Sequence, residues 1–354
     1  MFINNNFLQK LCFLGLVFLL ISCNSKSKET SPILIHKEQS IVINDEKTPI
    51  ELYGQLSVKG TKILDQFKNP VQLRGMSFFW SQWISKYYNI ETLKWLKEDW
   101  RCNVVRIPLG IEVEGFLENP KKEKEKVFKM IDAAIELGMY IIIDWHDHNA
   151  ENHLKESKEF FEEVAKRYGK YPNVIYEVYN APLDNVSWSK VIKPYHEKLI
   201  KTIRKYDADN IIICGTRTWS QQIEEVADDL IDADNIVYGL HFYSSTHKQD
   251  IRDRTFRAIE KGVPVFVSEF GTSEASGDGF LDKTETELWW DFLDKNDISW
   301  VNWSISDKNE TTSALKGGAS DRGNWDIDEI TVSGQLVREE LRKKNPVPKK
   351  RALQ

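Results

Sequence analysis

The chain has 354 residues, and its 48 basic and 54 acidic side chains give a formal net charge of −6. This acidic balance argues against a nucleic-acid-binding protein, and 41% hydrophobic with 29% charged residues excludes a multi-span membrane protein and a fully disordered chain. Twelve Trp, 12 Tyr and 17 Phe are many for an ordinary core, and such side chains often form recognition surfaces for ligands with flat apolar faces.

The first 22 residues are predicted to be an export signal. The apolar run 11–21 is too short for a bilayer of about 30 Å but suits a signal peptide. Residues 20–23 (Leu-Ile-Ser-Cys) resemble a bacterial lipobox, in which Cys23 carries lipid; an ordinary signal with a chance cysteine is the alternative. Residues 23–50 read as a flexible, solvated tether. We therefore expect an exported protein, held at the cell envelope or cell surface by a lipid anchor alone.

Residues 51–345 alternate short apolar runs with amphipathic stretches. Eight runs are predicted strands: 72–77, 104–109, 140–146, 174–180, 210–215, 236–243, 265–271 and 300–305. Eight stretches are predicted helices: 90–100, 121–137, 155–168, 188–206, 221–230, 251–261, 284–295 and 334–344. The strands are continuously apolar, as in parallel sheets covered on both faces. This alternation predicts a (β/α)8 TIM barrel; a doubly wound sheet is the alternative, but its Gly-rich turn is missing.

Two smaller segments and two cysteines complete the description of the chain. Residues 53–70 are predicted to form a short β-hairpin before the barrel, at the end where the strands begin. Cys102 and Cys214 adjoin apolar runs and are expected to be buried free thiols, since no CxxC pair or disulfide framework is present. The basic tail 346–354 is expected to be solvated, and the barrel is expected to act as a monomer.

Polar and aromatic side chains gather where the predicted strands end, which is the end of a (β/α)8 barrel that carries chemistry. They come from different strands: Arg106, Asp144, His146, His148, Asn180, His241, Tyr243, Glu269, Asn302 and Trp303. One polar residue at a strand end often only satisfies backbone groups. So many on separate strands predict a shared cleft.

The residue types narrow the chemistry of that cleft. Asp144, His146 and His148 are a weak match to a metal site, and the Gly-x-Ser-x-Gly turn of a serine hydrolase is missing. We therefore expect no metal and no cofactor. Glycoside hydrolysis requires two carboxyl groups beside the sugar bond and benefits from aromatic platforms. Glu269 supplies one carboxyl group at the end of a strand.

Seven stretches resemble glycoside hydrolase family five, the cellulase family, and most closely its bacterial endoglucanase branch. They are Leu73–Ser77, Val104–Pro108, Ile143–His146, Val174–Asn180, Gly239–Tyr243, Val267–Gly271 and Trp300–Ser304. The likeness runs from about residue 53 to residue 344. It implies a retaining β-1,4-glucan endohydrolase acting on polysaccharide, with a β-glucan as its partner.

The resemblance also implies roles for individual residues. Glu269 corresponds to the nucleophile, with Tyr243 bonded to its carboxylate and Arg106 beside it, keeping it ionised. His241 would contact the reacting sugar and the acid/base, and Asn180 would hold the sugar 2-hydroxyl group. The remaining positions correspond to sugar contacts: His146, Trp80, Trp219, Trp303 and Lys308.

One position departs from the family pattern. Family members have Asn-Glu-Pro after the fourth strand, where the Glu is the general acid/base, whereas this chain has Asn180-Ala181-Pro182. Ala181 cannot exchange a proton, and general acid–base catalysis contributes about 10²–10⁴-fold. Glu177 lies four residues back along the predicted strand, roughly 13 Å deeper at about 3.3 Å per residue, and makes a poor substitute. Asp184, in the following loop, is the other candidate substitute.

Three interpretations follow from Ala181. The chain could be an endoglucanase that has lost its acid/base, by nature or by design. It could be a residual enzyme that cleaves substrates with good leaving groups. It could also be a noncatalytic glucan-binding lipoprotein of the cell surface. Cellulose, mixed-linkage glucan, mannan and xylan all stay open as the glycan, because loops set that choice.

Overall fold

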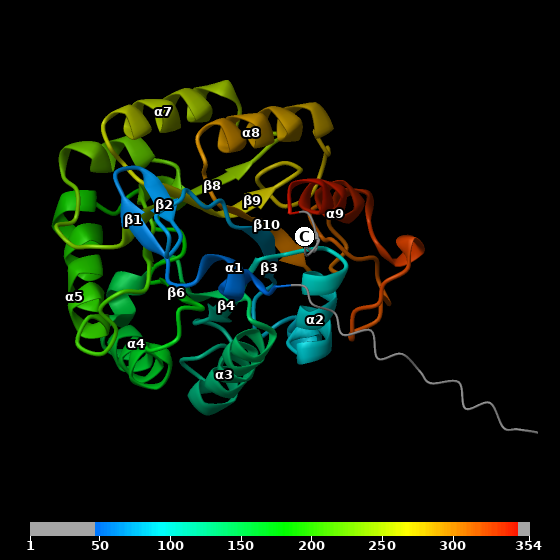
Figure 1. Ribbon diagram of the computed structural model, residues 1–354, viewed down its shortest axis with the longest axis horizontal. Helices are drawn as coiled ribbons and strands as arrows, with labels where there is room; N and C mark the ends of the chain where they lie inside the picture. The colour runs from blue at the N-terminus through cyan, green and yellow to red at the C-terminus, as the bar shows by residue number, and fades with distance from the viewer. Residues whose placement is uncertain (1–46, 346–354) are drawn as a thin grey trace, which may run out of the picture. The chain divides into compact units, whose positions relative to one another are not determined.

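A closed barrel of eight parallel strands forms the centre of the structure, a computed structural model that describes residues 47–345 (Figure 1). The predicted signal, the tether up to residue 46 and the tail 346–354 lie outside the described residues. Each strand pairs with the next in the chain and β10 closes on β3. The strands are β3 (Arg74–Phe78), β4 (Val104–Gly110), β5 (Tyr140–His146), β6 (Val174–Glu177), β7 (Ile212–Cys214), β8 (Ile236–Tyr243), β9 (Val265–Gly271) and β10 (Trp300–Ile305). This confirms the predicted (β/α)8 barrel.

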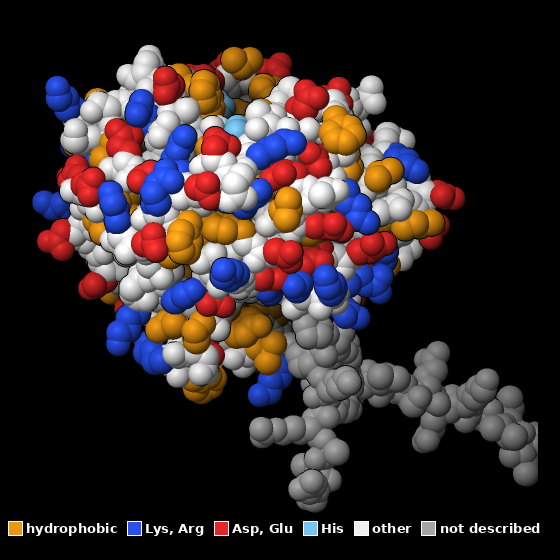
Figure 2. Space-filling model, turned by 90° about the horizontal axis from the view of Figure 1, so that it is seen from above, with side chains coloured by type: hydrophobic (Ala, Val, Ile, Leu, Met, Phe, Trp, Pro, Cys, Tyr) orange, Lys and Arg blue, Asp and Glu red, His pale blue; other side chains and the backbone are white. Residues whose placement is uncertain are grey.

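Helices surround the barrel and cover its outer face (Figure 1). The longer ones are α2 (Ile90–Glu98), α3 (Pro120–Leu137), α4 (Leu154–Tyr168), α5 (Lys193–Ile203), α7 (Gln249–Glu260), α8 (Lys283–Lys295) and α9 (Val332–Lys344). Among residues 47–345, none of the helices combines the length and the apolar composition that a membrane span requires. Figure 2 shows basic and acidic side chains interspersed over one face, without an extended basic surface there.

The local sequence of α3 shows why such a helix forms and where it ends. Pro120 occupies the first turn, where its missing N–H group costs no helical hydrogen bond. Val127, Ile131 and Ala134 lie on one face at helical spacing and are buried, so that face packs on the barrel. Gly138 then takes a left-handed conformation with a φ of 66°, which ends the helix.

The predicted hairpin closes the end of the barrel at which the strands begin. It consists of β1 (Ser57–Lys59) paired antiparallel with β2 (Lys62–Leu64), and α1 (Pro49–Tyr53) precedes it. Ile63 is buried in one cluster with Val104 and Tyr140, the first residues of β4 and β5. The hydroxyl group of Tyr140 donates to the carbonyl oxygen of Gly54 at 2.6 Å. The opposite end of the barrel is therefore the one available for a site.

The structure shifts several predicted boundaries. β6 ends at Glu177 rather than Asn180, although the N–H group of Asn180 still donates to the carbonyl oxygen of Trp145 at 3.2 Å. The predicted helix 188–206 is a π-helical turn, η3 (Trp188–Ile192), followed by α5. The predicted helix 221–230 is the 3-10 segment η4 (Ile223–Asp228). Cys102 and Cys214 are buried free thiols, as predicted.

Candidate active site

A cleft of about 570 Å³ lies where the strands end. Figure 2 shows histidine side chains recessed among hydrophobic ones in a hollow at the upper edge of that view. Nearly all the site residues expected from the sequence line the cleft: Trp80, His146, Asn180, Ala181, Trp219, His241, Tyr243, Glu269, Trp303 and Lys308. Arg106 is absent from the lining because it lies buried beneath the cleft. Cys23 lies outside the described residues.

The register of the barrel brings the polar side chains together. Ser77 on β3 lies opposite Arg106 on β4, and His241 on β8 lies opposite Glu269 on β9. Asp144 on β5 likewise lies opposite Glu177, the last residue of β6. Parallel strands in register carry these side chains to one level, so residues far apart in sequence meet beneath the cleft.

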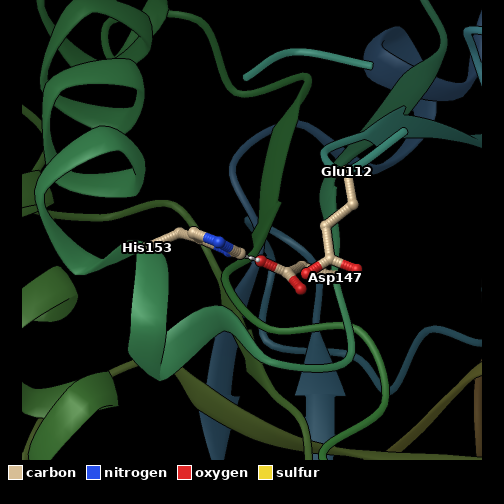
Figure 3. Close-up of side chains that lie close together, drawn as sticks. All are labelled: Glu112, Asp147 and His153. Atoms are coloured by element: carbon tan, nitrogen blue, oxygen red, sulfur yellow. Dashed lines mark hydrogen bonds and ion pairs between the residues drawn. The ribbon is translucent and has the colours of Figure 1, made fainter. Parts of the chain in front are cut away.

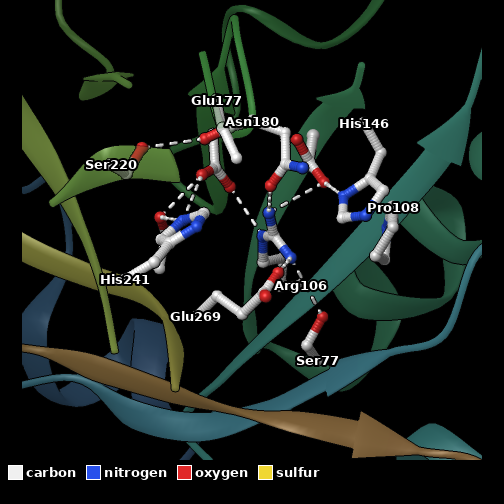
Figure 4. Close-up of polar contacts among 12 residues, drawn as sticks. Ser77, Arg106, Pro108, His146, Glu177, Asn180, Ser220, His241 and Glu269 are labelled. Atoms are coloured by element: carbon white, nitrogen blue, oxygen red, sulfur yellow. Dashed lines mark hydrogen bonds and ion pairs between the residues drawn. The ribbon is translucent and has the colours of Figure 1, made fainter. Parts of the chain in front are cut away.

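Arg106 is the centre of this polar network (Figure 4). Its Nη1 atom lies 3.2 Å from Oε2 of Glu269, and its Nε atom donates to Oε2 of Glu177 at 2.7 Å. Its Nη2 atom lies 3.0 Å from Oδ2 of Asp144 and donates to Oδ1 of Asn180 at 2.7 Å. One buried guanidinium group thus contacts three carboxyl groups and the side chain of Asn180.

Burial and charge act on these groups in opposite directions. Burial alone would raise the pKa of Glu177, but Arg106 and His241 lower it below its ordinary value. Burial raises the pKa of Asp144 well above its ordinary value in spite of Arg106. Burial, and then Arg106, lower the pKa of His146 well below its ordinary value, so its imidazole is neutral at neutral pH. The Nδ1 atom of His146 lies 2.5 Å from Oδ2 of Asp144.

Both oxygens of the Glu269 carboxyl group are held by donors. Arg106 contacts Oε2, and the hydroxyl group of Tyr243 donates to Oε1 at 2.8 Å. Burial, followed by the charge of Glu269, raises the pKa of Tyr243 well above its ordinary value, so its phenol keeps its proton. These contacts fix the orientation of Glu269 at the cleft, which suits a positioned nucleophile.

Glu177 lies at the end of β6 and not deep within a longer strand, as the sequence had suggested. The 13 Å estimate assumed a strand that continues to Asn180, but β6 ends at Glu177 itself. Ser268 donates to Oε1 of Glu177 at 2.6 Å, and Nε2 of His241 lies 2.9 Å from the Ser268 oxygen. Glu177 is completely buried, paired with Arg106 and outside the cleft lining. It supports the site from below and offers no acidic proton to a sugar.

Ala181 presents only a methyl group to the cleft. Its carbonyl oxygen lies 3.0 Å from Nδ1 of His148, which also lines the cleft. The cleft lining contains a second carboxyl group besides that of Glu269. It belongs to Glu310, which is paired with Lys308 at 2.5 Å. Asp184 lies outside the lining and accepts a hydrogen bond from Thr218 at 2.6 Å. The structure therefore does not bring Asp184 into the cleft beside Ala181.

Aromatic rings form the walls of the cleft. Trp303 lies parallel to His146, with ring centroids 5.3 Å apart and planes 6° apart. Trp80 and Trp83 lie with centroids 4.9 Å apart at 33°. Trp219 is 46% exposed and has a φ of 52°, a left-handed conformation that is unusual for a bulky residue. Such surfaces can contact the apolar faces of sugar rings.

Several lining residues were not found from the sequence. They are Phe79, Trp83, Gln221, His247, Glu310 and the segment 275–277. Most lie in connecting segments after strands, whose course no periodic pattern reveals. A weak signal existed for Glu310, because it follows Lys308 closely in the chain.

Arg106→Gln is expected to destabilise the fold strongly. Arg106 is fully buried and contacts Asp144, Glu177 and Glu269, so its loss leaves buried carboxyl groups without their cation. Breaking a buried ion pair costs about 3–5 kcal/mol. Urea unfolding followed by circular dichroism measures the change, with the exposed Arg322→Gln as control. A loss below about 1 kcal/mol would show that the network does not need its cation.

Known proteins share both the sequence and the fold. A model of cellulase, glycosyl hydrolase family 5, matches residues 64–309, more than half of the chain. An endoglucanase of Clostridium saccharobutylicum is 43% identical over 291 residues, which cover 81% of this chain and 65% of that protein. This chain thus spans about two thirds of the length of such curated relatives.

Two solved structures are similar over most of the chain. One from Cytophaga hutchinsonii is 52% identical, with a TM-score of 0.84, and covers 84% of this chain and 98% of its own. The catalytic domain of a Thermobifida fusca endoglucanase variant, in complex with cellotetraose, is 35% identical with a TM-score of 0.81, and covers 84% of this chain and all of its own. The chain belongs to glycosyl hydrolase family 5, the cellulase family.

Proposed function

We propose that this chain is a β-1,4-glucan-directed endohydrolase scaffold with retaining geometry, in which Ala181 stands where the acid/base carboxyl group is needed. One observation carries the proposal. Arg106 and Tyr243 hold a carboxyl group, Glu269, at the cleft, while the position after Asn180 offers a methyl group. As a consequence, the chain binds glucan but hydrolyses unactivated glucan poorly.

The proposed chemistry has two steps. In the first, an oxygen of Glu269 attacks the anomeric carbon, and the leaving oxygen departs with the bonding electron pair. With a sugar as leaving group, that oxygen needs a proton, which Ala181 cannot supply. In the second step, water must displace Glu269 and lose a proton, again without a base. Both steps are therefore slow on natural glucans.

The walls of the cleft and the relatives support a glucan as ligand. Trp80, Trp219 and Trp303 line the cleft, as do the polar side chains of Asn180 and Lys308. The similar Thermobifida fusca domain is known in complex with cellotetraose, a β-1,4-linked glucose oligomer. Isothermal titration calorimetry with cellotetraose, together with a reducing-sugar assay on carboxymethylcellulose, tests the proposal. Binding with little turnover supports it, and no binding contradicts it.

A second candidate is a noncatalytic glucan-binding lipoprotein of the cell surface. It rests on the same cleft, on the missing carboxyl group and on Cys23, which would carry the lipid. In this case glucan capture is the function and Glu269 is a remnant. Restoring Ala181→Glu distinguishes the two candidates, because a pure binding protein would gain no activity. Metabolic labelling with an alkyne fatty acid, compared with Cys23→Ala, tests the anchor.

Trp303→Ala is expected to weaken cellotetraose binding by about tenfold or more, because an aromatic wall of the cleft is lost. Trp219→Ala should also weaken binding. Because Trp219 is exposed, this substitution is not expected to disturb folding, so a loss of affinity can be assigned to the lost sugar contact. Phe280→Ala is the control, since Phe280 is 66% exposed and lies outside the cleft lining. Calorimetry measures all three. Unchanged affinity in both tryptophan variants would place the sugar elsewhere.

A further inference from the structure

A second cluster of ligand-type side chains lies outside the cleft lining. Glu112 follows β4, Asp147 directly follows β5, and His153 ends the 3-10 segment η2 (Ala150–His153). One oxygen or nitrogen atom from each lies within 4.8 Å of the others. Figure 3 shows the carboxyl groups of Glu112 and Asp147 side by side, with the imidazole of His153 pointing at Asp147. None of the three lines the cleft.

The carboxyl groups of this cluster are held by few partners. Asp147 is 2% exposed and accepts from Nε1 of Trp145 at 3.2 Å and from the N–H group of Asn149 at 2.8 Å. Its Oδ2 atom lies 2.7 Å from Nδ1 of His153. Within residues 47–345, no Lys or Arg pairs with Asp147 or Glu112, and the Glu112 carboxyl group accepts no side-chain hydrogen bond. A carboxyl group thus lies unpaired beside a buried one.

We propose that Glu112, Asp147 and His153 bind one divalent transition-metal ion of the zinc or manganese type. Two carboxyl oxygens and one imidazole nitrogen suit these ions, whereas Mg²⁺ and Ca²⁺ prefer oxygen ligands alone. On binding, the ion displaces the proton in the hydrogen bond between His153 and Asp147, and this proton is released to solvent. Glu112 is exposed, so its side chain is free to change rotamer and bring its carboxyl group to the ion as the third ligand. Water fills the remaining coordination positions.

The ion would have a structural effect on the catalytic cleft. It joins the segment after β4 to the segment after β5, and Asp147 stands between His146 and His148, which both line the cleft. Trp145, which donates to Asp147, is fully buried in the core. The metal would therefore act as a clamp that fixes one wall of the cleft without touching the sugar. This proposal departs from the expectation of no metal that was drawn from the sequence.

The test uses the full chain, stripped with EDTA and dialysed against metal-free buffer. Calorimetry with ZnCl₂ and separately with MnCl₂ should show one ion per chain for at least one of them, together with a raised melting temperature. Glu112→Gln and His153→Gln should each weaken binding by about 100-fold or more, because even changes to groups that support ligands cost 10–100-fold. Glu118→Gln, on the same connecting segment and also exposed, is the matched control.

The outcomes are separable. Stoichiometric binding that falls in both ligand variants and stays in Glu118→Gln supports the site. The proposal is overturned if neither ion binds with a Kd below about 1 mM, which corresponds to a binding free energy of only about −4 kcal/mol. Binding that is unchanged in Glu112→Gln and His153→Gln also overturns it, because the ion then lies at other histidines. Because glucan binding is measured independently, failure here leaves the proposed function intact.

Discussion

Ala181→Glu is expected to raise hydrolysis of carboxymethylcellulose by about 10²–10⁴-fold, the usual contribution of a general acid–base group. Glu269, Arg106 and Tyr243 are already in contact with one another, so the substitution adds the one group that the proposed reaction lacks. Ala181 lines the cleft, which gives a longer side chain open space on one side. A reducing-sugar assay measures the increase.

Ala181→Gln is the matched control, because Gln has nearly the shape of Glu and no titratable proton. It should stay as inactive as the parent. Equal gains in both variants would mean that size rather than proton transfer matters at this position. No gain in Ala181→Glu, with cellotetraose binding intact, would favour the glucan-binding lipoprotein.

If the unsubstituted chain hydrolyses natural glucan slowly, the source of the proton for that reaction can be tested. Glu310 is the lining carboxyl group besides Glu269, and Lys308 pairs with it at 2.5 Å. If Glu310 supplied protons, Glu310→Gln would abolish residual turnover of natural glucan. We expect instead that Glu310→Gln leaves this turnover within about twofold, because the carboxyl group of Glu310 is already bound by Lys308. The same assay, run with more enzyme and longer times, measures the difference.

The sequence predicted the barrel well because its signal is periodic and local. Continuous apolar runs such as 140–146 and 236–243 match β5 and β8 residue for residue, since buried parallel strands need apolar side chains on both faces. The prediction failed where the chain leaves regular pairing. β6 ends at Glu177, and nothing in the run 174–180 distinguishes its paired residues from those that follow.

The site was only partly visible for a related reason. Residues at strand ends, such as Glu269 and His241, could be found because the barrel topology places them. The contacts of Glu177 with Arg106 and Ser268 depend on register between strands that are far apart in sequence, which one sequence does not specify. Glu112 and His153 lie in connecting segments, so their approach to Asp147 required the folded chain.

With an activated aryl glycoside such as 2,4-dinitrophenyl β-cellobioside, the parent chain is expected to accumulate a covalent adduct on Glu269. The aryloxide leaves with its electron pair and needs little help from a proton donor, so the first step survives without the missing acid. The second step lacks its base and is slow. We expect a burst of phenolate followed by slow turnover, and intact-protein mass spectrometry should show one added cellobiosyl group.

Azide should speed up the slow step, because it is a nucleophile that carries no proton to remove. It would displace the Glu269 carboxylate from the anomeric carbon and form β-cellobiosyl azide, with retained configuration after two displacements. Ala181 leaves room for the anion, whereas a glutamate there would repel it; azide should therefore accelerate the parent chain and not Ala181→Glu. Glu269→Gln should form no adduct. Turnover of the aryl glycoside without any adduct, burst or azide effect would contradict a retaining reaction at Glu269.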